Sequence, residues 1–357
     1  MLWPDQRLQD LFGIDHPILQ APMALTATPD LAAAVSQAGG LGALGCGEMA
    51  EPVLRSVVAE LRSKTSRAFN LNFFVHPAPD TSPATFARTR ARLQPWYDRL
   101  GLGPVPQALR PRQAGFDEAR LRLVLDLRPK VVSFHFGPPE PQAVRALQDA
   151  GIRVIGTATS VAEAKVLAAA GFDAVIAQGY EAGGHRGSHR PMAPGDGVGT
   201  MALVPQVVDA VRLPVIAAGG IGDGRGIAAA FALGAAGVQM GTAFLLCPEA
   251  ATPERRRVAL RQARDTDTMV SDAFSGRAAR TRRSAYGLDM AATAEPLPDF
   301  PALYDLSGPL IEAGPLAAVS FDLWGQAAAL SREVPAADLV ADLVRDTKSV
   351  LARLTAP

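Results

Sequence analysis

His185 is the side chain whose sequence setting best suits acid–base chemistry. It lies in residues 178–190, which contain four glycines and read Gln-Gly-Tyr-Glu-Ala-Gly-Gly-His-Arg-Gly-Ser-His-Arg. An imidazole changes charge near neutral pH, so it can remove a carbon-bound proton or pair with an anion. The glycines let backbone N–H groups approach a ligand closely, because no Cβ stands in the way. We therefore expect this segment to form one wall of a small-molecule site.

The apolar run that precedes this segment, residues 173–177, is typical of a buried parallel strand. Similar runs recur along the chain, separated mostly by alanine-rich stretches of helical period that often end in Ala-Gly, where glycine would cap a helix. This repeat indicates a parallel sheet covered by helices, and eight repeats favour an α/β fold of the (β/α)₈ TIM barrel type over an open doubly wound sheet. The expected strands cover residues 17–23, 41–46, 69–75, 131–136, 153–158, 173–178, 214–219 and 237–245.

Two regions do not fit the repeat. Residues 76–128 are rich in Pro and Arg and too long for one strand-to-helix connection, so we expect a rim insertion. Residues 247–357 follow the last expected strand and include expected helices near 253–264 and 335–354. The sequence thus predicts a barrel domain over residues 1–246 and a C-terminal helical lid, over residues 247–357, that packs on it.

The bulk composition removes several classes of partner. The 35 basic and 35 acidic residues give zero formal charge, which leaves no electrostatic argument for nucleic acid or an acidic membrane surface. No apolar run reaches the ~20 residues of a membrane helix, and the N-terminus lacks a signal-peptide layout. Cys46 and Cys247 make no disulfide framework. We therefore expect a cytoplasmic protein that acts on small molecules, with its oligomeric state open.

Two motifs with a ligand-binding appearance are rejected. His185 and His189 lie four residues apart, a metal-like spacing, but no carboxylate or cysteine supports them, so no metal is predicted. Residues 45–50 match a dinucleotide fingerprint, yet the next expected strand, 69–75, lacks the acidic residue that a ribose would need. His135 is either a core histidine or a residue that faces a substrate.

The carboxyl ends of the expected strands carry one polar and glycine-rich set, and in barrels of this class the chemistry sits at those ends. The glycines after the seventh and eighth strands are typical of a phosphate pocket, although they also fit simple tight turns. The set comprises Gln20-Ala21-Pro22-Met23, Asn72, His135, Gln178, Gly219-Gly220 and Gln239-Met240-Gly241-Thr242.

Taken in order, these motifs resemble the nitronate monooxygenase family of FMN-dependent barrels. The resemblance covers residues 13–247 and, more weakly, 324–326. Phe134-His135-Phe136-Gly137 and His185-Arg186-Gly187 are similar to the class I enzymes of bacteria and fungi. The motifs that carry the resemblance are Gln20–Met23, Ala38-Gly39-Gly40-Leu41-Gly42, Asn72, residues 178–187, Ala218-Gly219-Gly220-Ile221 and Gln239–Thr242.

The resemblance implies FMN as the cofactor and His185 as the catalytic residue at its reactive end, with His135 and Tyr304 on the substrate side. The tail departs from the family pattern, because Tyr304 alone keeps the expected type in residues 300–308, where a lysine and a further tyrosine are missing. The implied FMN contacts are Ala21, Pro22 and Met23 along the isoalloxazine, Asn72 and Gln178 at its polar edge, and Gly183, Gly184, Gly219, Gly220, Gln239, Met240, Gly241 and Thr242 around ribityl and phosphate.

The resemblance implies oxidation of alkyl nitronates, with nitroalkanes as further candidates, by O₂ to a carbonyl product and nitrite. Two alternatives stay open: an FMN-dependent NAD(P)H reductase of enoyl thioesters or quinones on the same barrel, and a non-catalytic flavin-binding protein. Rapid reduction of the flavin by NADH or NADPH would favour the reductase. The proline-rich residues 271–325 are expected to close over the flavin and set the size of the substrate.

Overall fold

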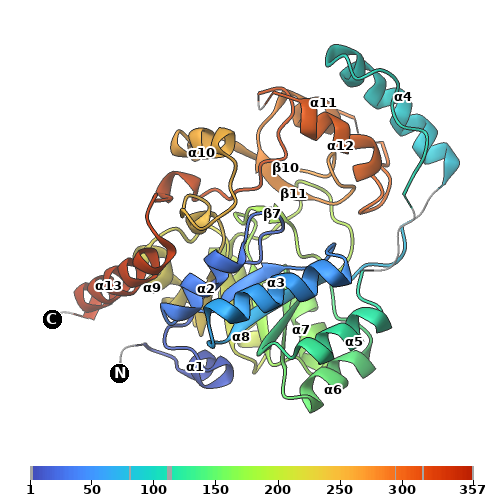
Figure 1. Cartoon of the computed structure of the whole chain (residues 1–357). Helices are drawn as coiled ribbons and strands as arrows, with labels where there is room; N and C mark the ends of the chain where they lie inside the picture. Colours follow the sequence, from blue (N-terminus) through green and yellow to red (C-terminus); the bar gives the residue numbers. More distant parts are fainter. Residues whose placement is uncertain (1–2, 80–81, 111–114, 294, 316, 356–357) are drawn as a thin grey trace.

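The computed structural model describes residues 3–79, 82–110, 115–293, 295–315 and 317–355. Its eight parallel strands follow the spatial order β1-β9-β8-β6-β5-β4-β3-β2, and a bridge between Leu19 and Leu41 closes the ring (Figure 1). The predicted (β/α)₈ barrel, with strands at the eight predicted places, is confirmed. The strands are β1 (Ile18–Gln20), β2 (Gly42–Gly45), β3 (Phe69–Phe74), β4 (Val131–His135), β5 (Arg153–Ala158), β6 (Ala174–Gln178), β8 (Val215–Ala218) and β9 (Gly237–Met240).

A helix follows each barrel strand along the chain, and these helices surround the sheet in Figure 1. Glycine at positive φ confirms the predicted caps after α2, α6, α7 and α9, with φ values of 88°, 78°, 82° and 90° at Gly39, Gly151, Gly171 and Gly234. The helices are α2 (Pro29–Gln37), α3 (Glu51–Lys64), α5 (Glu118–Leu127), α6 (Pro141–Asp149), α7 (Val161–Ala169), α8 (Thr200–Ala210), α9 (Gly224–Ala232) and α13 (Ala336–Thr355).

Two apolar layers hold the barrel together. Neighbouring residues of a strand, such as Val154 and Ile155 of β5, belong to different buried clusters, since successive side chains point to opposite faces of a sheet. Leu8 and Phe12 of α1 (Arg7–Phe12) join the same cluster as Ile155. Because both faces of each strand are buried, the strands read as continuous apolar runs in the sequence.

The connection from β9 to α13 carries a second, smaller sheet. In it β11 (Ala279–Arg282) pairs antiparallel with β10 (Thr268–Ser271) on one side and with β7 (Gly184–His185) on the other. The glycine-rich segment after β6 is therefore a strand that pairs with the tail. The remaining tail elements are η1 (Thr242–Phe244), α10 (Glu254–Arg261), α11 (Ala285–Ala291), α12 (Tyr304–Ala313) and η2 (Ala328–Leu330).

The expected rim insertion contains α4 (Pro83–Arg99), which packs against α12 of the tail (Figure 1). Trp96 and Tyr97 of α4 share a buried cluster with Tyr286 and Leu306 of the tail, and the Tyr97 hydroxyl donates to the carbonyl of Leu306 at 2.7 Å. Within the predicted range 76–128, α4 thus contacts the tail, whereas α5 contacts the barrel helices α3 and α6.

The final helix, α13, packs on α9 and α2, where Leu339 and Leu343 join the main barrel cluster. It takes the place of the eighth outer helix, while residues 268–293, 295–315 and 317–319 form a lobe with α4 over the carboxyl ends of the strands. The domain boundary at residue 246 stays a prediction. No helix in the described part of the chain combines the length and apolar character that a membrane span requires.

Candidate active site

The backbone of His185 is fixed by side chains at the ends of two strands. Its carbonyl accepts hydrogen bonds from Nε2 of Gln178, at the end of β6, and from Nε2 of His135, at the end of β4, both at 3.1 Å. Oε1 of Gln178 also accepts from the N–H of Gly187 at 2.8 Å. Gln178 and His135 therefore hold the loop that carries His185.

The ring of His185 is held from the other side by Ser275 of the tail. Nε2 of His185 lies 2.9 Å from Oγ of Ser275, which donates to the carbonyl of Arg277 at 3.1 Å. Because the one hydroxyl hydrogen points to that carbonyl, Nε2 of His185 is assigned as the donor to Ser275. This assignment leaves Nδ1 of His185 with a free lone pair, the atom that can accept a proton.

Both histidines are held in the neutral form. Burial lowers the pKa of His185 to about 3, with smaller contributions in the same direction from His135 and Arg277. Burial likewise lowers the pKa of His135 to about 4, against a partial opposing effect of its bond to the His185 carbonyl. A neutral imidazole can act as a base, whereas a protonated one cannot.

Five aromatic residues, named here the aromatic cage, lie around His185, and four of them contact its ring directly. They come from the barrel (Phe74 and Phe136) and from the tail (Phe300, Tyr304 and Phe321). The ring centroids of Phe300, Phe136, Phe321 and Phe74 lie 5.3, 5.8, 6.0 and 6.2 Å from that of His185. Tyr304 lies 6.0 Å from Phe300 and 5.8 Å from Phe321. The tail thus covers His185 with apolar surface.

Three buried arginines brace the loop, and two of them, Arg277 and Arg280, come from the tail. Arg186 donates to the carbonyls of Gly179 and Gln178 at 2.6 and 2.8 Å. Arg280 donates to the carbonyl of Tyr180 at 2.7 Å, and the guanidinium of Arg277 lies 3.9 Å over the centre of the Phe136 ring. Bonds from a charged donor are stronger than neutral ones, so these contacts fix the loop firmly.

The predicted phosphate side brings together the loops after β6, β8 and β9. Gly219 and Gly220 have φ values of 107° and 73°, a conformation that favours glycine. A Cβ on Gly183 would lie 2.4 Å from the backbone of Trp324, so the tail packs directly on this loop. Oγ1 of Thr242 accepts from the N–H of Gly325 at 2.9 Å.

The N-terminus of α9, the helix that follows Gly219 and Gly220, is capped by the residue just before it. The side chain of Asp223 accepts from the N–H groups of Arg225 and Gly226 at the start of α9. The carboxylate of Glu181, beside Gly220, is held by the N–H and hydroxyl of Thr200 at the start of α8. The glycine N–H groups, and not these helix ends, are therefore the donors left for an anion.

The predicted isoalloxazine side is formed by residues at the ends of β1 and β9. Ala21, Pro22 and Met23 are half-buried, and the N–H of Ala21 donates to the carbonyl of Met240 at 2.8 Å. A Cβ on Gly241 would lie 3.2 Å from Cβ of Ala21 and 3.7 Å from Sδ of Met23. These residues thus meet at the mouth of the barrel.

Two polar side chains from the predicted set differ in what they bind. Nδ2 of Asn72 donates to Oγ and the carbonyl of Ser133, at 2.9 and 3.2 Å. Oε1 of Gln239 is buried and has no hydrogen-bond partner among the described residues. A buried polar atom without a partner is costly, so Gln239 is the stronger candidate for a ligand contact.

The sequence reasoning did not single out Ser275, Arg277 or Phe74. Ser275 and Arg277 flank Gly276 in a tail segment whose pairing with residues 184–185 no local pattern reveals. At the positions where the tail departs from the family pattern, Ser307 is buried and donates to the carbonyl of Phe274, and a Cβ on Gly308 would meet nothing within 4 Å.

No metal centre is formed by the described residues, which contain no group of three His, Cys, Asp or Glu side chains suited to a metal ion. Nε2 of His189 lies 3.1 Å from the carbonyl of Thr157. Its ring is thus part of the packing around the loop.

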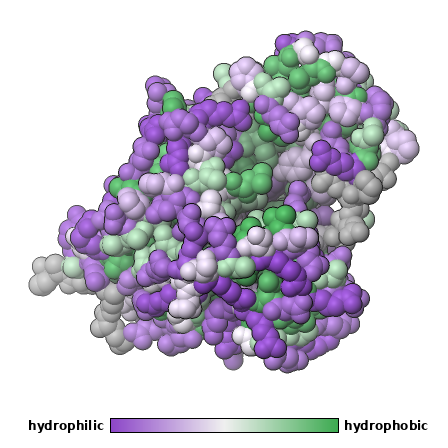
Figure 2. All heavy atoms as spheres, viewed as in Figure 1, coloured by the Kyte–Doolittle hydropathy of each residue, from purple (hydrophilic) through white to green (hydrophobic). Residues whose placement is uncertain are grey.

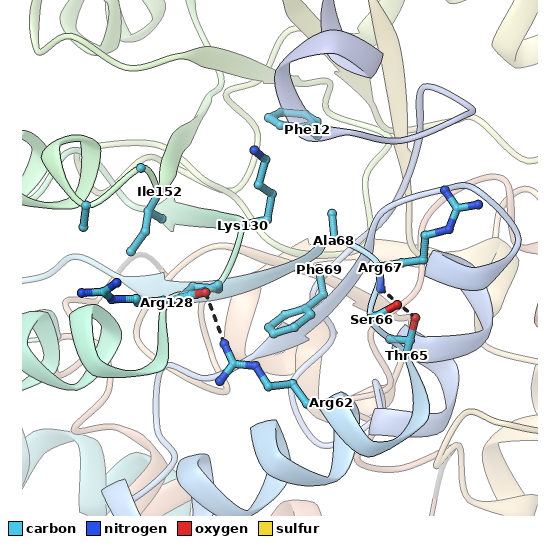
Figure 3. A pocket seen from close by; sticks show the side chains of 13 residues that line it. Phe12, Arg62, Thr65, Ser66, Arg67, Ala68, Phe69, Arg128, Lys130 and Ile152 are labelled. Carbon is cyan, nitrogen blue, oxygen red and sulfur yellow. Dashed lines mark hydrogen bonds between the residues drawn. The ribbon is translucent and has the colours of Figure 1, made fainter.

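A cavity of about 490 Å³ lies at the opposite end of the barrel, below β3, β4 and β5 (Figure 3). Arg62, Arg67, Arg128 and Lys130 line it, but Arg62 is bound to the carbonyls of Leu127 and Arg128 at the end of α5. Basic side chains at a helix C-terminus stabilise the helix. This cavity is separate from the site of His185.

Comparisons with known proteins extend over nearly the whole chain. A model of the nitronate monooxygenase family matches residues 5–346. A relative named nitronate monooxygenase, from Pseudomonas aeruginosa, is 45% identical over 349 residues, which cover 96% of this chain and 99% of the relative. Both the insertion and the tail therefore fall within the similarity.

Solved structures are also similar to this chain over nearly its whole length. A nitroalkane oxidase from Streptomyces ansochromogenes superposes with a TM-score of 0.86 at 36% identity, covering 98% of this chain and 100% of that chain. FabK from Thermotoga maritima superposes with a TM-score of 0.74 at 35% identity, covering 98% and 97% of the two chains.

Proposed function

The chain belongs to the nitronate monooxygenase family, and on this basis we propose that it oxidises alkyl nitronates with O₂, using bound FMN, to a carbonyl product and nitrite. The single observation that carries the proposal is the position of the His185 imidazole, which Ser275 holds at the barrel mouth between glycine-rich strand ends and the aromatic cage with Nδ1 left as an acceptor. A small organic substrate beside a redox cofactor needs this combination of a base, an anion pocket and an apolar enclosure.

The residues at the mouth fit FMN. Gly219 and Gly220 offer backbone N–H groups without a side chain, which suits a phosphate. The unpartnered Oε1 of Gln239 suits a ribityl hydroxyl, and Ala21 to Met23 offer an apolar surface to a flat ring. Members of this family are flavin-dependent, and bound FMN would supply the electron-accepting chemistry.

His185 acts on the carbon atom that bears the nitro group. With a neutral nitroalkane, Nδ1 of His185 removes the proton from that carbon and so generates the nitronate anion. A substrate that arrives as the nitronate has already lost this proton. His185 then only orients the negatively charged group. The polar contacts to Ser275 hold the imidazole plane during this step.

Gln178 and His135 act through His185. Each donates to the carbonyl of His185, and the second polar atom of each side chain is also engaged, by Gly187 and by Thr157 respectively. We therefore assign them a positioning role, in place of the direct flavin and substrate contacts that the family pattern implies. Tyr304, in the aromatic cage, keeps its proposed place on the substrate side.

The proposal is tested with the FMN-loaded protein in air. Addition of the nitronate of nitropropane should consume O₂ and release nitrite, with one molecule of carbonyl product formed for each nitrite. NADH or NADPH, added without a nitronate, should not be oxidised at a comparable rate. Fast oxidation of either nicotinamide with no nitrite formation from nitronates would favour the reductase alternative and overturn the proposal.

A further inference from the structure

The cavity of about 490 Å³ below β3, β4 and β5 lies at the end of the barrel opposite to His185. Figure 2 shows an apolar hollow between the barrel and the lobe of α4, α11 and α12, on the side of β7, whereas the cavity carries four basic side chains. Its volume falls within the roughly 300–1,000 Å³ that is usual for small-molecule sites. The proposed function uses none of the residues that line it.

Parallel pairing of β3 with β4 brings the basic side chains together from two connections of the chain. Asn70 lies opposite Val131 in this pairing, so the end of α3 and the turn after it meet the end of α5 below the sheet. The whole chain has no net charge, yet none of the described residues that line the cavity is Asp or Glu, so the cavity is locally positive. The cations are Arg62, Arg67, Arg128 and Lys130 (Figure 3).

Helix capping accounts for only one of these cations. Arg62 donates to two carbonyls at the end of α5, where a cation stabilises the helix terminus. Arg67 forms an exposed ion pair with Asp15 at 3.0 Å, a kind of contact that contributes little and can be exchanged for another anion. The side chains of Arg128 and Lys130 have no hydrogen bond or ion pair within the described part of the chain. These two cations are therefore available to an anionic ligand.

Arg128 occupies a backbone position that favours glycine. It ends α5 with a φ of 41°, in the left-handed region, whereas the left-handed residue at the ends of α2, α6, α7 and α9 is glycine. Strain of this kind costs folding energy and is found most often at functional sites. Since the side chain has no polar partner in the described part of the chain, the strain favours a role for its guanidinium in binding a ligand.

We propose that this cavity binds the diphosphate group of a small molecule. A guanidinium matches phosphate oxygens with pairs of hydrogen bonds, and a lysine ammonium adds a compact positive charge. A single phosphate would leave cations without a partner, whereas a diphosphate carries enough negative charge to pair with Arg128, Lys130 and Arg67. The hydroxyls of Thr65 and Ser66 line the same cavity and offer further donors.

The test measures ligand binding to the FMN-loaded protein by isothermal titration calorimetry without divalent metal ions. Bound FMN keeps the proposed phosphate pocket at the barrel mouth occupied. We expect pyrophosphate to bind about tenfold more tightly than orthophosphate, and more weakly at high salt. ADP is the second probe. If it binds at least as tightly as pyrophosphate, the ligand is an organic diphosphate, and binding of pyrophosphate alone identifies the inorganic ion. No saturable binding of either probe at millimolar concentration would overturn the proposal.

Two variants in the cavity and one outside it locate the site. Lys130→Gln and Arg128→Gly should each weaken pyrophosphate binding about tenfold, the effect of losing one charged hydrogen-bond donor. Glycine suits a φ of 41°, so Arg128→Gly should unfold at or above the wild-type midpoint. Arg122→Gln removes an exposed charge of α5 outside the cavity and should change binding less than about twofold. Equal weakening in all three variants, or unchanged binding in both cavity variants, would overturn the proposal.

Discussion

Oγ of Ser275 lies 2.9 Å from Nε2 of His185, a contact between the tail and the loop after β6 across 90 positions of the chain. The same tail segment pairs with the loop as a strand, with Ala279 opposite His185. The site is therefore completed by the tail, and the reactive nitrogen of the imidazole is chosen by a residue outside the barrel strands.

Ser275→Ala should lower kcat/KM for a neutral nitroalkane about three- to tenfold, because the bond that fixes the tautomer of His185 contributes about 0.5–1.5 kcal/mol. Ser275→Thr, which keeps the hydroxyl, should recover most of the loss. The pH profile of kcat/KM should shift in the alanine variant and not in the threonine variant. Equal losses in the two variants with unshifted profiles would point to packing alone.

His185→Gln should separate the two kinds of substrate. Turnover of a neutral nitroalkane should fall by about a hundred- to ten-thousand-fold, the usual contribution of a general base. Turnover of the matching preformed nitronate should fall much less, because its proton is already gone. FMN content after purification, read from the flavin absorbance, should match wild type. Equal losses with both substrates would argue against proton removal by His185.

Acid should destabilise the fold before most carboxylates titrate. The pKa of His135 and of His185 is lowered by burial to about 4 and about 3, whereas an unfolded histidine titrates near 6.5. Above pH 6.5 neither state binds these protons. Below it the unfolded chain binds protons that the folded chain does not, so the free energy of unfolding falls by up to about 1.4 kcal/mol per pH unit for each histidine.

Thermal unfolding midpoints at pH 7, 6 and 5 measure this effect, and the comparison is with His135→Gln, which can still donate to the His185 carbonyl. In the variant, the decrease in the unfolding midpoint between pH 6.5 and 5 should be clearly smaller than in wild type. An identical decrease in wild type and variant would show that His135 is not a neutral buried group.

Three glycine-to-alanine variants test how the tail is docked. A Cβ at Gly183 would lie 2.4 Å from the backbone of Trp324, so Gly183→Ala should displace the tail and lower both stability and turnover. Gly184→Ala meets no neighbour but has a φ of 80°, so strain alone should cost about 1–2 kcal/mol. Gly195→Ala, with neither clash nor positive φ, is the control. If limited proteolysis and unfolding midpoints gave the same result for all three variants, the tail would not be docked on the loop as described.

The barrel was predictable because its signals are local. A strand such as β5, with Val154 and Ile155 buried in opposite layers, leaves an apolar run in the sequence, and Gly151 before it marks the end of a helix. His185 could be singled out for a similar reason, since its glycine-rich setting lies within a few residues. The family resemblance then supplied a set of expected contacts at the strand ends.

The tail was not predictable in the same way. Ser275, Phe300 and Phe321 contact His185 from a tail that is held by pairing of β11 with β7 and by packing of α12 on α4, and such long-range contacts leave no periodic pattern. The roles expected for Gln178 and His135 depended on which polar atoms are already bonded, and only the folded geometry reveals that both brace the His185 carbonyl.

The most direct test of the account is rapid anaerobic mixing of the FMN-loaded protein with the nitronate of nitropropane, and separately with NADH and NADPH, while the flavin absorbance is followed. The account predicts that the nitronate reduces the flavin quickly enough to support turnover and that neither nicotinamide does. Rapid bleaching by NADH or NADPH, with no change on addition of the nitronate, would contradict it.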